Sequence, residues 1–153
     1  MKRLLIVFAL LLLGPLGAFA QTKEETIAFI TSEYRSFEGL GYTYKQVAFS
    51  PGGDAFTLRR TAQGRKEYVV TFRLKDVDIY KVTLNHANGI NRHQLMVRPR
   101  GAEPNMARDG FSFKAPMKIT PAMEDERKCQ ALERAFTHLT TLTTGRKFLF
   151  YTP

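Results

Sequence analysis

The chain has 153 residues, of which 44% are hydrophobic and 24% charged, and its formal net charge is +9. This length suits one ordinary domain with a hydrophobic core of its own. Cys129 is the only cysteine, which excludes an intramolecular disulfide.

The first twenty residues have the layout of a secretory signal peptide. A positive start, Met1-Lys2-Arg3, precedes the apolar run Leu4–Leu13, and small residues at Ala18 and Ala20 close the segment. The run is too short to span a bilayer, which takes about 20 residues, and no later segment is apolar enough to do so. The sequence therefore predicts a signal peptide over 1–20 and a single periplasmic or secreted domain over 21–153.

This prediction fixes the mass of the exported protein. We expect cleavage after Ala20 because the charged start, the apolar core and the small-residue site occur in the required order. Intact-mass analysis of the exported material should give a chain that begins at Gln21. A mass that retains residues 1–20 would contradict the assignment.

A helix is predicted over about 23–38. Thr22 and Glu25 have the spacing of a capping box, in which each side chain accepts a hydrogen bond from the other residue's backbone. Apolar residues then recur at helical spacing: Ile27, Ile30, Tyr34 and Phe37. Gly39 and Gly41 are expected to end the helix.

About six strands are predicted next, because β-branched and aromatic residues alternate with polar ones between short turns. The runs are Tyr42–Phe49, Phe56–Leu58, Tyr68–Leu74, Tyr80–Leu84, Leu95–Val97 and one from Phe111 toward Ile119. The turns are Ser50–Asp54, Thr61–Arg65 and Ala87–Gly89, with a bend at Lys75-Asp76. Short turns favour antiparallel pairing of neighbours, so we expect a meander. The segment Pro99–Gly110 is expected to be a long exposed loop.

A second, strongly amphipathic helix is predicted near the C-terminus. Thr120 is its expected cap, with Pro121 at the first helical position and Gly145 as its end. Its apolar stripe consists of Cys129, Leu132, Phe136, Leu139 and Leu142. This spacing predicts a buried thiol. The apolar tail Phe148–Tyr151 is expected to pack somewhere on the domain.

The predicted class is α+β: an N-terminal helix, an antiparallel meander that forms a bent sheet or partial barrel, and a C-terminal helix packed on the sheet. Over roughly residues 42–143, this order resembles that of pleckstrin-homology-like domains, in which a helix plugs one end of a bent sheet. The chain is also similar to small exported proteins of Bacteroidota. Neither resemblance transfers a functional residue.

Positive charge is concentrated in the middle of the chain. Residues 56–118 hold 13 Lys and Arg against 5 Asp and Glu, whereas the flanking segments are nearly balanced. Such a segment suits an anionic partner, such as a lipid, an acidic glycan or a protein. Nucleic acid is not expected, because no recognition motif is present. Arg98, Arg100 and Arg108, in or beside the long loop, are the candidate contacts; the alternative is a solvated face that only maintains solubility.

An enzyme is the alternative function. His86 and His93 flank the predicted Asn88-Gly89 turn, where Asp78 could complete a metal site, but zinc needs three or four ligands that nothing in this spacing fixes. The plainer interpretation is two polar hairpin residues. A small hydrolase or metal-dependent enzyme that uses His86 and His93 is thus weighed against a non-catalytic binding module.

Nucleophilic catalysis has little support in the sequence. His138 lies nine residues beyond Cys129, about 13 Å along a helix, which is too far for a direct pair. Ser50 lies in a glycine-rich turn without the Gly-x-Ser-x-Gly elbow, and no Walker motif or dinucleotide fingerprint occurs. The sequence therefore predicts no catalytic residue, metal ligand set or cofactor, and it favours the binding module.

Overall fold

The computed structural model describes residues 22–38, 42–62, 67–85, 88–101, 106–109 and 111–145. Several predictions fall outside these ranges. They concern the signal peptide and its cleavage site, Gly39 and Gly41 after the first helix, Gly64 in a turn, His86 and the tail Phe148–Tyr151.

The first helix, α2 (Lys23–Arg35), begins as predicted. The Thr22 hydroxyl accepts a hydrogen bond from the Glu25 amide at 3.2 Å, and the Glu25 carboxylate accepts one from the Thr22 amide at 2.8 Å, so the capping box is confirmed. The regular helix ends three residues before the predicted end at 38, and a turn follows in which the Phe37 and Glu38 amides donate to carbonyls three rather than four residues back, at 3.2 and 3.1 Å. Ile30, Tyr34 and Phe37 face the core.

The larger sheet has five strands, and every paired neighbour is antiparallel. In spatial order these are β1 (Tyr42–Phe49), β2 (Ala55–Ala62), β3 (Glu67–Arg73), β6 (Met106–Arg108) and β7 (Phe111–Phe113). Strand β6 lies inside the segment 99–110, so the prediction that this whole segment is a loop was wrong. Three residues are too few for side-chain alternation to reveal a strand.

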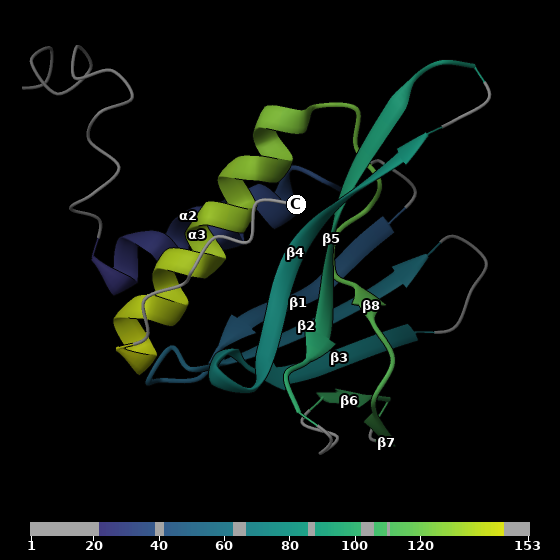
Figure 1. Ribbon diagram of the computed structural model, residues 1–153. Helices are drawn as coiled ribbons and strands as arrows, with labels where there is room; N and C mark the ends of the chain where they lie inside the picture. Colours follow the sequence, from purple (N-terminus) through teal and green to yellow (C-terminus); the bar gives the residue numbers. More distant parts are fainter. Residues whose placement is uncertain are drawn as a thin grey trace, which may run out of the picture.

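The smaller sheet has three strands, which cross in front of the larger sheet in the view of Figure 1. Its order is β4 (Val77–Asn85), β5 (Asn91–Pro99) and β8 (Met117–Lys118). The predicted bend at Lys75-Asp76 is the 3-10 helix η1 (Leu74–Asp76), which carries the chain from β3 into the smaller sheet. The α+β class with antiparallel strands is confirmed, and the meander is divided between two sheets rather than being one continuous ladder.

The single strand predicted from Phe111 toward Ile119 is two strands in different sheets. Residues 111–113 form β7 at one end of the larger sheet, and residues 117–118 form β8 beside β5. Lys114, Ala115 and Pro116 connect them and are exposed. The prediction failed because alternation marks strand residues but does not identify their partners.

The last helix, α3 (Glu126–Thr144), begins later than predicted. Asp125 caps it by accepting a hydrogen bond from the Lys128 amide at 3.1 Å. Thr120 is not a cap: its hydroxyl is buried and accepts from the Leu95 amide at 2.9 Å, which keeps the chain beside β5. Gly145 ends the helix at a φ of 68°, as predicted, because glycine adopts the left-handed conformation without strain.

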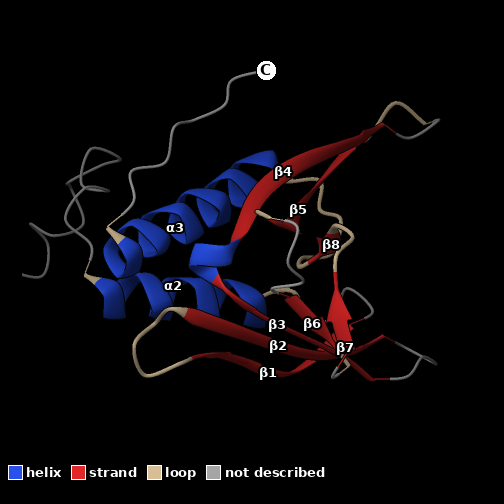
Figure 2. Cartoon of the chain, turned by 60° about the horizontal axis from the view of Figure 1, so that its bottom comes forward, coloured by secondary structure: helices blue, strands red, loops and turns tan. Residues whose placement is uncertain are grey.

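The core lies between the sheets and α3, and α2 packs beside α3 (Figures 1 and 2). The Phe56 ring lies 5.3 Å from Phe136 of α3 and 5.8 Å from Tyr34 of α2, so both helices reach the larger sheet. The Tyr34 hydroxyl donates to the Ile119 carbonyl at 2.8 Å. Of the predicted stripe on α3, only Leu142 is solvent-exposed. No helix among the described residues has the length and apolar character needed to cross a membrane.

Candidate functional site

The smaller sheet has one face against the core and one face toward solvent. On β5, His93, Leu95 and Val97 are buried, so the residues between them project outward. Residues on β4 and β8 that pair directly with these outward residues of β5 lie on the same side of the sheet. We call this side the outer face; it consists of Asp78, Tyr80, Val82 and Leu84 on β4, Arg92, Gln94, Met96 and Arg98 on β5, and Lys118 on β8.

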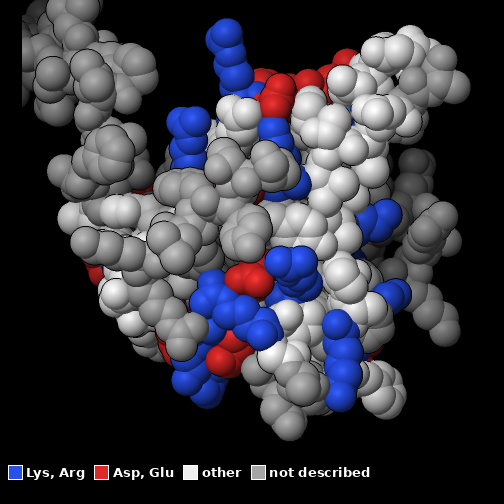
Figure 3. Space-filling view, in the orientation of Figure 1, with Lys and Arg blue, Asp and Glu red and all other residues white. Residues whose placement is uncertain are grey.

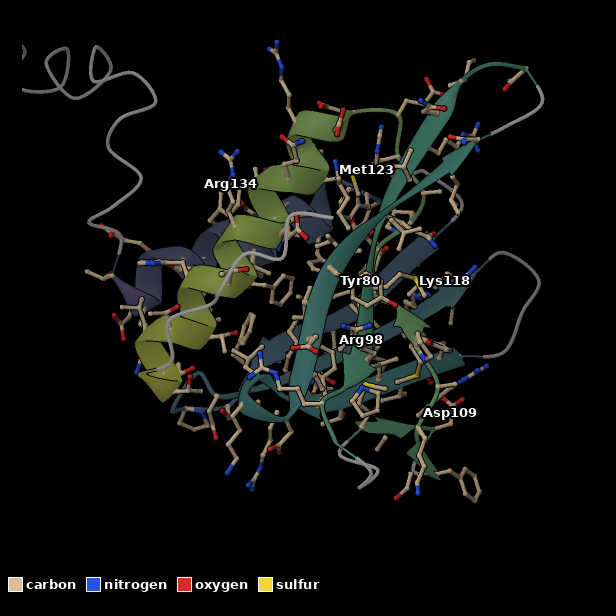
Figure 4. All side chains as sticks on the ribbon, viewed as in Figure 1. Tyr80, Arg98, Asp109, Lys118, Met123 and Arg134 are labelled. Atoms are coloured by element: carbon tan, nitrogen blue, oxygen red, sulfur yellow. The ribbon has the colours of Figure 1, made fainter. Side chains whose placement is uncertain are left out.

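A row across all three strands defines the centre of the outer face. Tyr80 is the direct partner of Met96, and Met96 is the direct partner of Lys118. The Arg98 guanidinium lies 5.2 Å from the centre of the Tyr80 ring, within the range of a cation–π contact. Figure 4 shows Tyr80, Arg98 and Lys118 close together on this sheet. The row thus places an aromatic ring among cations in a rigid frame.

Two of the three predicted arginines meet at one carboxylate. Arg100 Nε lies 2.6 Å from Asp78 Oδ1, and Arg98 Nε lies 3.5 Å from Asp78 Oδ2. Asp78 is the sole acid on the outer face as defined, so this cluster of three side chains keeps a net positive charge. The Arg98 side chain is 58% exposed, so its ion pair contributes little stability, whereas the Arg100–Asp78 pair is half-buried. We therefore interpret Asp78 as a residue that orients the two guanidinium groups.

Arg108 lies elsewhere, on β6 of the larger sheet. Its guanidinium stacks 4.8 Å from the centre of the Tyr68 ring, and its Nε lies 3.5 Å from the Asp109 carboxylate. Burial raises the pKa of Tyr68 above its ordinary value, while the nearby Arg60 and Arg108 charges oppose that rise. The structure thus brings Arg98 and Arg100 together and separates Arg108 from them.

Arg60 is a polar core residue that the sequence interpretation did not single out. It is 4% exposed, its guanidinium lies 4.8 Å from the centre of the Tyr68 ring, and its Nη2 is 3.5 Å from the Lys118 carbonyl. It thereby connects the two sheets below the outer face. The signal was present in the sequence, because strand alternation puts Arg60 on the same side as Phe56 and Leu58.

The histidine hypothesis gains no support from the described residues. His93 is 6% exposed; its Nδ1 lies 3.1 Å from the Thr83 hydroxyl, and its backbone pairs with Met123 in both directions. Asp78 is on the opposite face of the sheet, so it does not join His93 in a metal site. In the described part of the chain, no group of three His, Cys, Asp or Glu side chains could hold a metal ion. His86 lies outside that part.

The other candidate nucleophiles have structural roles. Cys129 is buried, and burial, reinforced by the Glu133 charge, raises the pKa of its thiol to about 12. The Ser50 hydroxyl donates to Asp54 at 2.6 Å and accepts from the Ala55 amide at 3.0 Å, which closes the predicted turn. The Ser50 contact lowers the pKa of Asp54. Neither residue is prepared for attack on a substrate.

Comparisons of the chain with known protein families, curated proteins and solved structures find no match. The similarities to pleckstrin-homology-like domains and to exported proteins of Bacteroidota therefore stay predictions. The site rests on the geometry of the outer face alone.

Proposed function

We propose that this protein is an exported, non-catalytic binding module that holds an anionic partner on the outer face of its smaller sheet. The observation that carries this proposal is the row of Tyr80, Met96 and Lys118 with Arg98 stacked on the tyrosine. The export component rests on the signal-like sequence of residues 1–20.

Rigid support favours a binding role for this face. The outer residues lie on paired strands, and β4 is fixed to α3 because the Lys81 amide donates to the Glu133 carboxylate at 2.9 Å and the Lys81 ammonium pairs with Glu126. A strand backbone held in this way loses less freedom when a partner binds.

The charge balance indicates the sign of the partner. The cations on and beside the outer face are Arg92, Arg98, Arg100 and Lys118, while Asp78 and, at its margin, Glu124 carry negative charge. Figure 3 shows Lys and Arg side chains spread over this side of the molecule, with fewer Asp and Glu among them. Because most of these charges are solvent-exposed, with Arg100 and Asp78 half-buried, the attraction should be screened within about 10 Å at 0.1 M salt.

Removing two cations from the outer face should weaken binding to anionic surfaces by roughly 30-fold at low salt, at about 1 kcal/mol for each cation. The variant is Arg98→Ala with Lys118→Ala, assayed by co-sedimentation with phosphatidylglycerol vesicles and by retardation on an acidic polysaccharide. Raising the salt concentration should weaken binding of the unchanged protein in the same assay.

The matched control is Arg127→Ala with Arg134→Ala, which removes the same charge from exposed positions of α3. Figure 4 shows Arg134 on the helix, away from the labelled residues of the sheet. An equal loss of affinity in both double variants would mean that binding depends only on the net charge of the protein. Binding that does not change with salt concentration would contradict the proposal.

A further inference from the structure

Phe111 stands apart from the other aromatic residues of this protein. It is 77% exposed, whereas the other phenylalanines with described side chains are buried or half-buried: Phe29, Phe37, Phe49, Phe56, Phe72 and Phe136. It begins β7, the end strand of the larger sheet, in a short hairpin with β6. Burying a ring this exposed against a partner would be favourable.

One cation lies across the strand pair from this ring, and two more follow within seven residues of the chain. Arg108 is its direct cross-strand partner, and Lys114 lies three residues further along the exposed connection to β8. Lys118 of the outer face follows on β8. Within residues 106–109 and 111–118, Asp109 is the sole acid, and its carboxylate accepts from the Val69 amide at 2.9 Å and lies 3.5 Å from Arg108. The region thus keeps a positive balance.

We propose that the β6–β7 hairpin attaches the protein to an anionic lipid bilayer, with Phe111 entering the headgroup region and Arg108, Lys114 and Lys118 contacting lipid phosphates. This deepens the proposed function, on which it rests, by naming the anionic partner as a membrane surface. The binding of a protein surface to a bilayer increases with the apolar area that it buries and with its electrostatic attraction to anionic lipids. Phenylalanine is among the side chains that such surfaces bury at the boundary of headgroups and acyl chains.

The hairpin and the outer face can contact one surface together. Seven residue steps separate Phe111 from Lys118, so the two Cα atoms are at most about 25 Å apart. Both Figure 1 and Figure 2 show β7 and β8 on the same side of the molecule. Lys118 thereby belongs to both contact regions.

A second copy of this chain is the less suitable occupant. Two copies meeting at this hairpin would bring Arg108, Lys114 and Lys118 of each against the same cations of the other, which is repulsive. A bilayer that contains anionic lipid offers the opposite charge and an apolar layer at the same place.

A tryptophan reporter tests the inference directly. The chain contains no tryptophan, so Phe111→Trp makes position 111 the only source of indole fluorescence. We expect its emission to shift to shorter wavelength when the exported protein is mixed with phosphatidylglycerol vesicles, and brominated acyl chains to quench it. Leu142→Trp, at a 45% exposed apolar position on α3, is the matched control and should show neither effect.

Binding measurements separate this inference from the proposed function. Phe111→Ser should lower the affinity for phosphatidylglycerol vesicles by about tenfold or more, with the fold checked by circular dichroism. Two results would contradict the membrane attachment without contradicting the proposed binding module. One is indole emission from the Phe111→Trp variant that stays unchanged while the protein binds vesicles in a salt-dependent way. The other is binding to the acidic polysaccharide without binding to vesicles. An equal shift with neutral phosphatidylcholine vesicles would overturn the role of the three cations. Absence of binding to any anionic surface would overturn both.

Discussion

Replacing Phe136 by alanine is expected to lower the free energy of unfolding by about 3–5 kcal/mol. The Phe136 side chain is fully buried on α3, and its ring meets Phe56 edge-on at 5.3 Å and Phe49 at 6.3 Å. These contacts join the C-terminal helix to β1 and β2. Truncation would leave a cavity at this junction, where the aromatic neighbours cannot all move inward.

Denaturant and thermal unfolding, each followed by circular dichroism, will measure this loss. Leu142→Ala on the same helix is the matched control, and it should lower stability much less than Phe136→Ala because Leu142 is 45% exposed to solvent. A Phe136 variant as stable as the unchanged protein would mean that α3 is not part of the core.

The Cys129 thiol should react with alkylating reagents at least about a thousandfold more slowly in the native protein than in the unfolded chain. Only the thiolate reacts, and burial raises the pKa of this thiol to about 12, so almost none is ionised at pH 8. An unfolded cysteine has a pKa of about 8.5 and is partly ionised there. Burial also blocks access of the reagent.

The same pKa shift predicts how stability depends on pH. Because the folded-state pKa lies above the unfolded value, the contribution of the neutral thiol to the free energy of unfolding is fully present below about pH 8.5 and is lost as the pH rises toward about 12.

Mass spectrometry will follow the labelling of Cys129 at pH 8. Cys129→Ala with Leu142→Cys moves the thiol to an exposed position of α3 and should label rapidly. Fast native labelling of Cys129, or a disulfide-linked dimer, would contradict the prediction.

The outer face shows how far the candidate site could be predicted. The charge count identified the basic segment that contains Arg98 and Arg100, because charge is a property of composition. The charge count could not predict that Arg108 lies on the other sheet or that Asp78 pairs with two arginines, since both facts depend on which strands pair. The exposure of Phe111 could not be predicted either, because an alternating strand pattern does not show whether another element of the fold covers the side chain.

Local chemistry by itself determined the elements whose causes lie within a few residues. The Thr22–Glu25 capping box, the Ser50–Asp54 turn and the Gly145 helix end depend on atoms within five positions in the chain. The helical spacing around Cys129 also predicted its burial, because one face of an amphipathic helix must pack against something.

Tertiary contacts decided the division into two sheets and the start of α3. The Thr120 hydroxyl accepts from Leu95, 25 residues away, and the Tyr34 hydroxyl donates to Ile119, 85 residues away. The first bond holds Thr120 beside β5 and the second holds Ile119 against α2, so the helix that a local Thr-Pro signal would start there begins only at Glu126. The intrinsic helix preference of a residue is worth only fractions of a kilocalorie per mole. The long-range contacts of a packed core outweigh this preference.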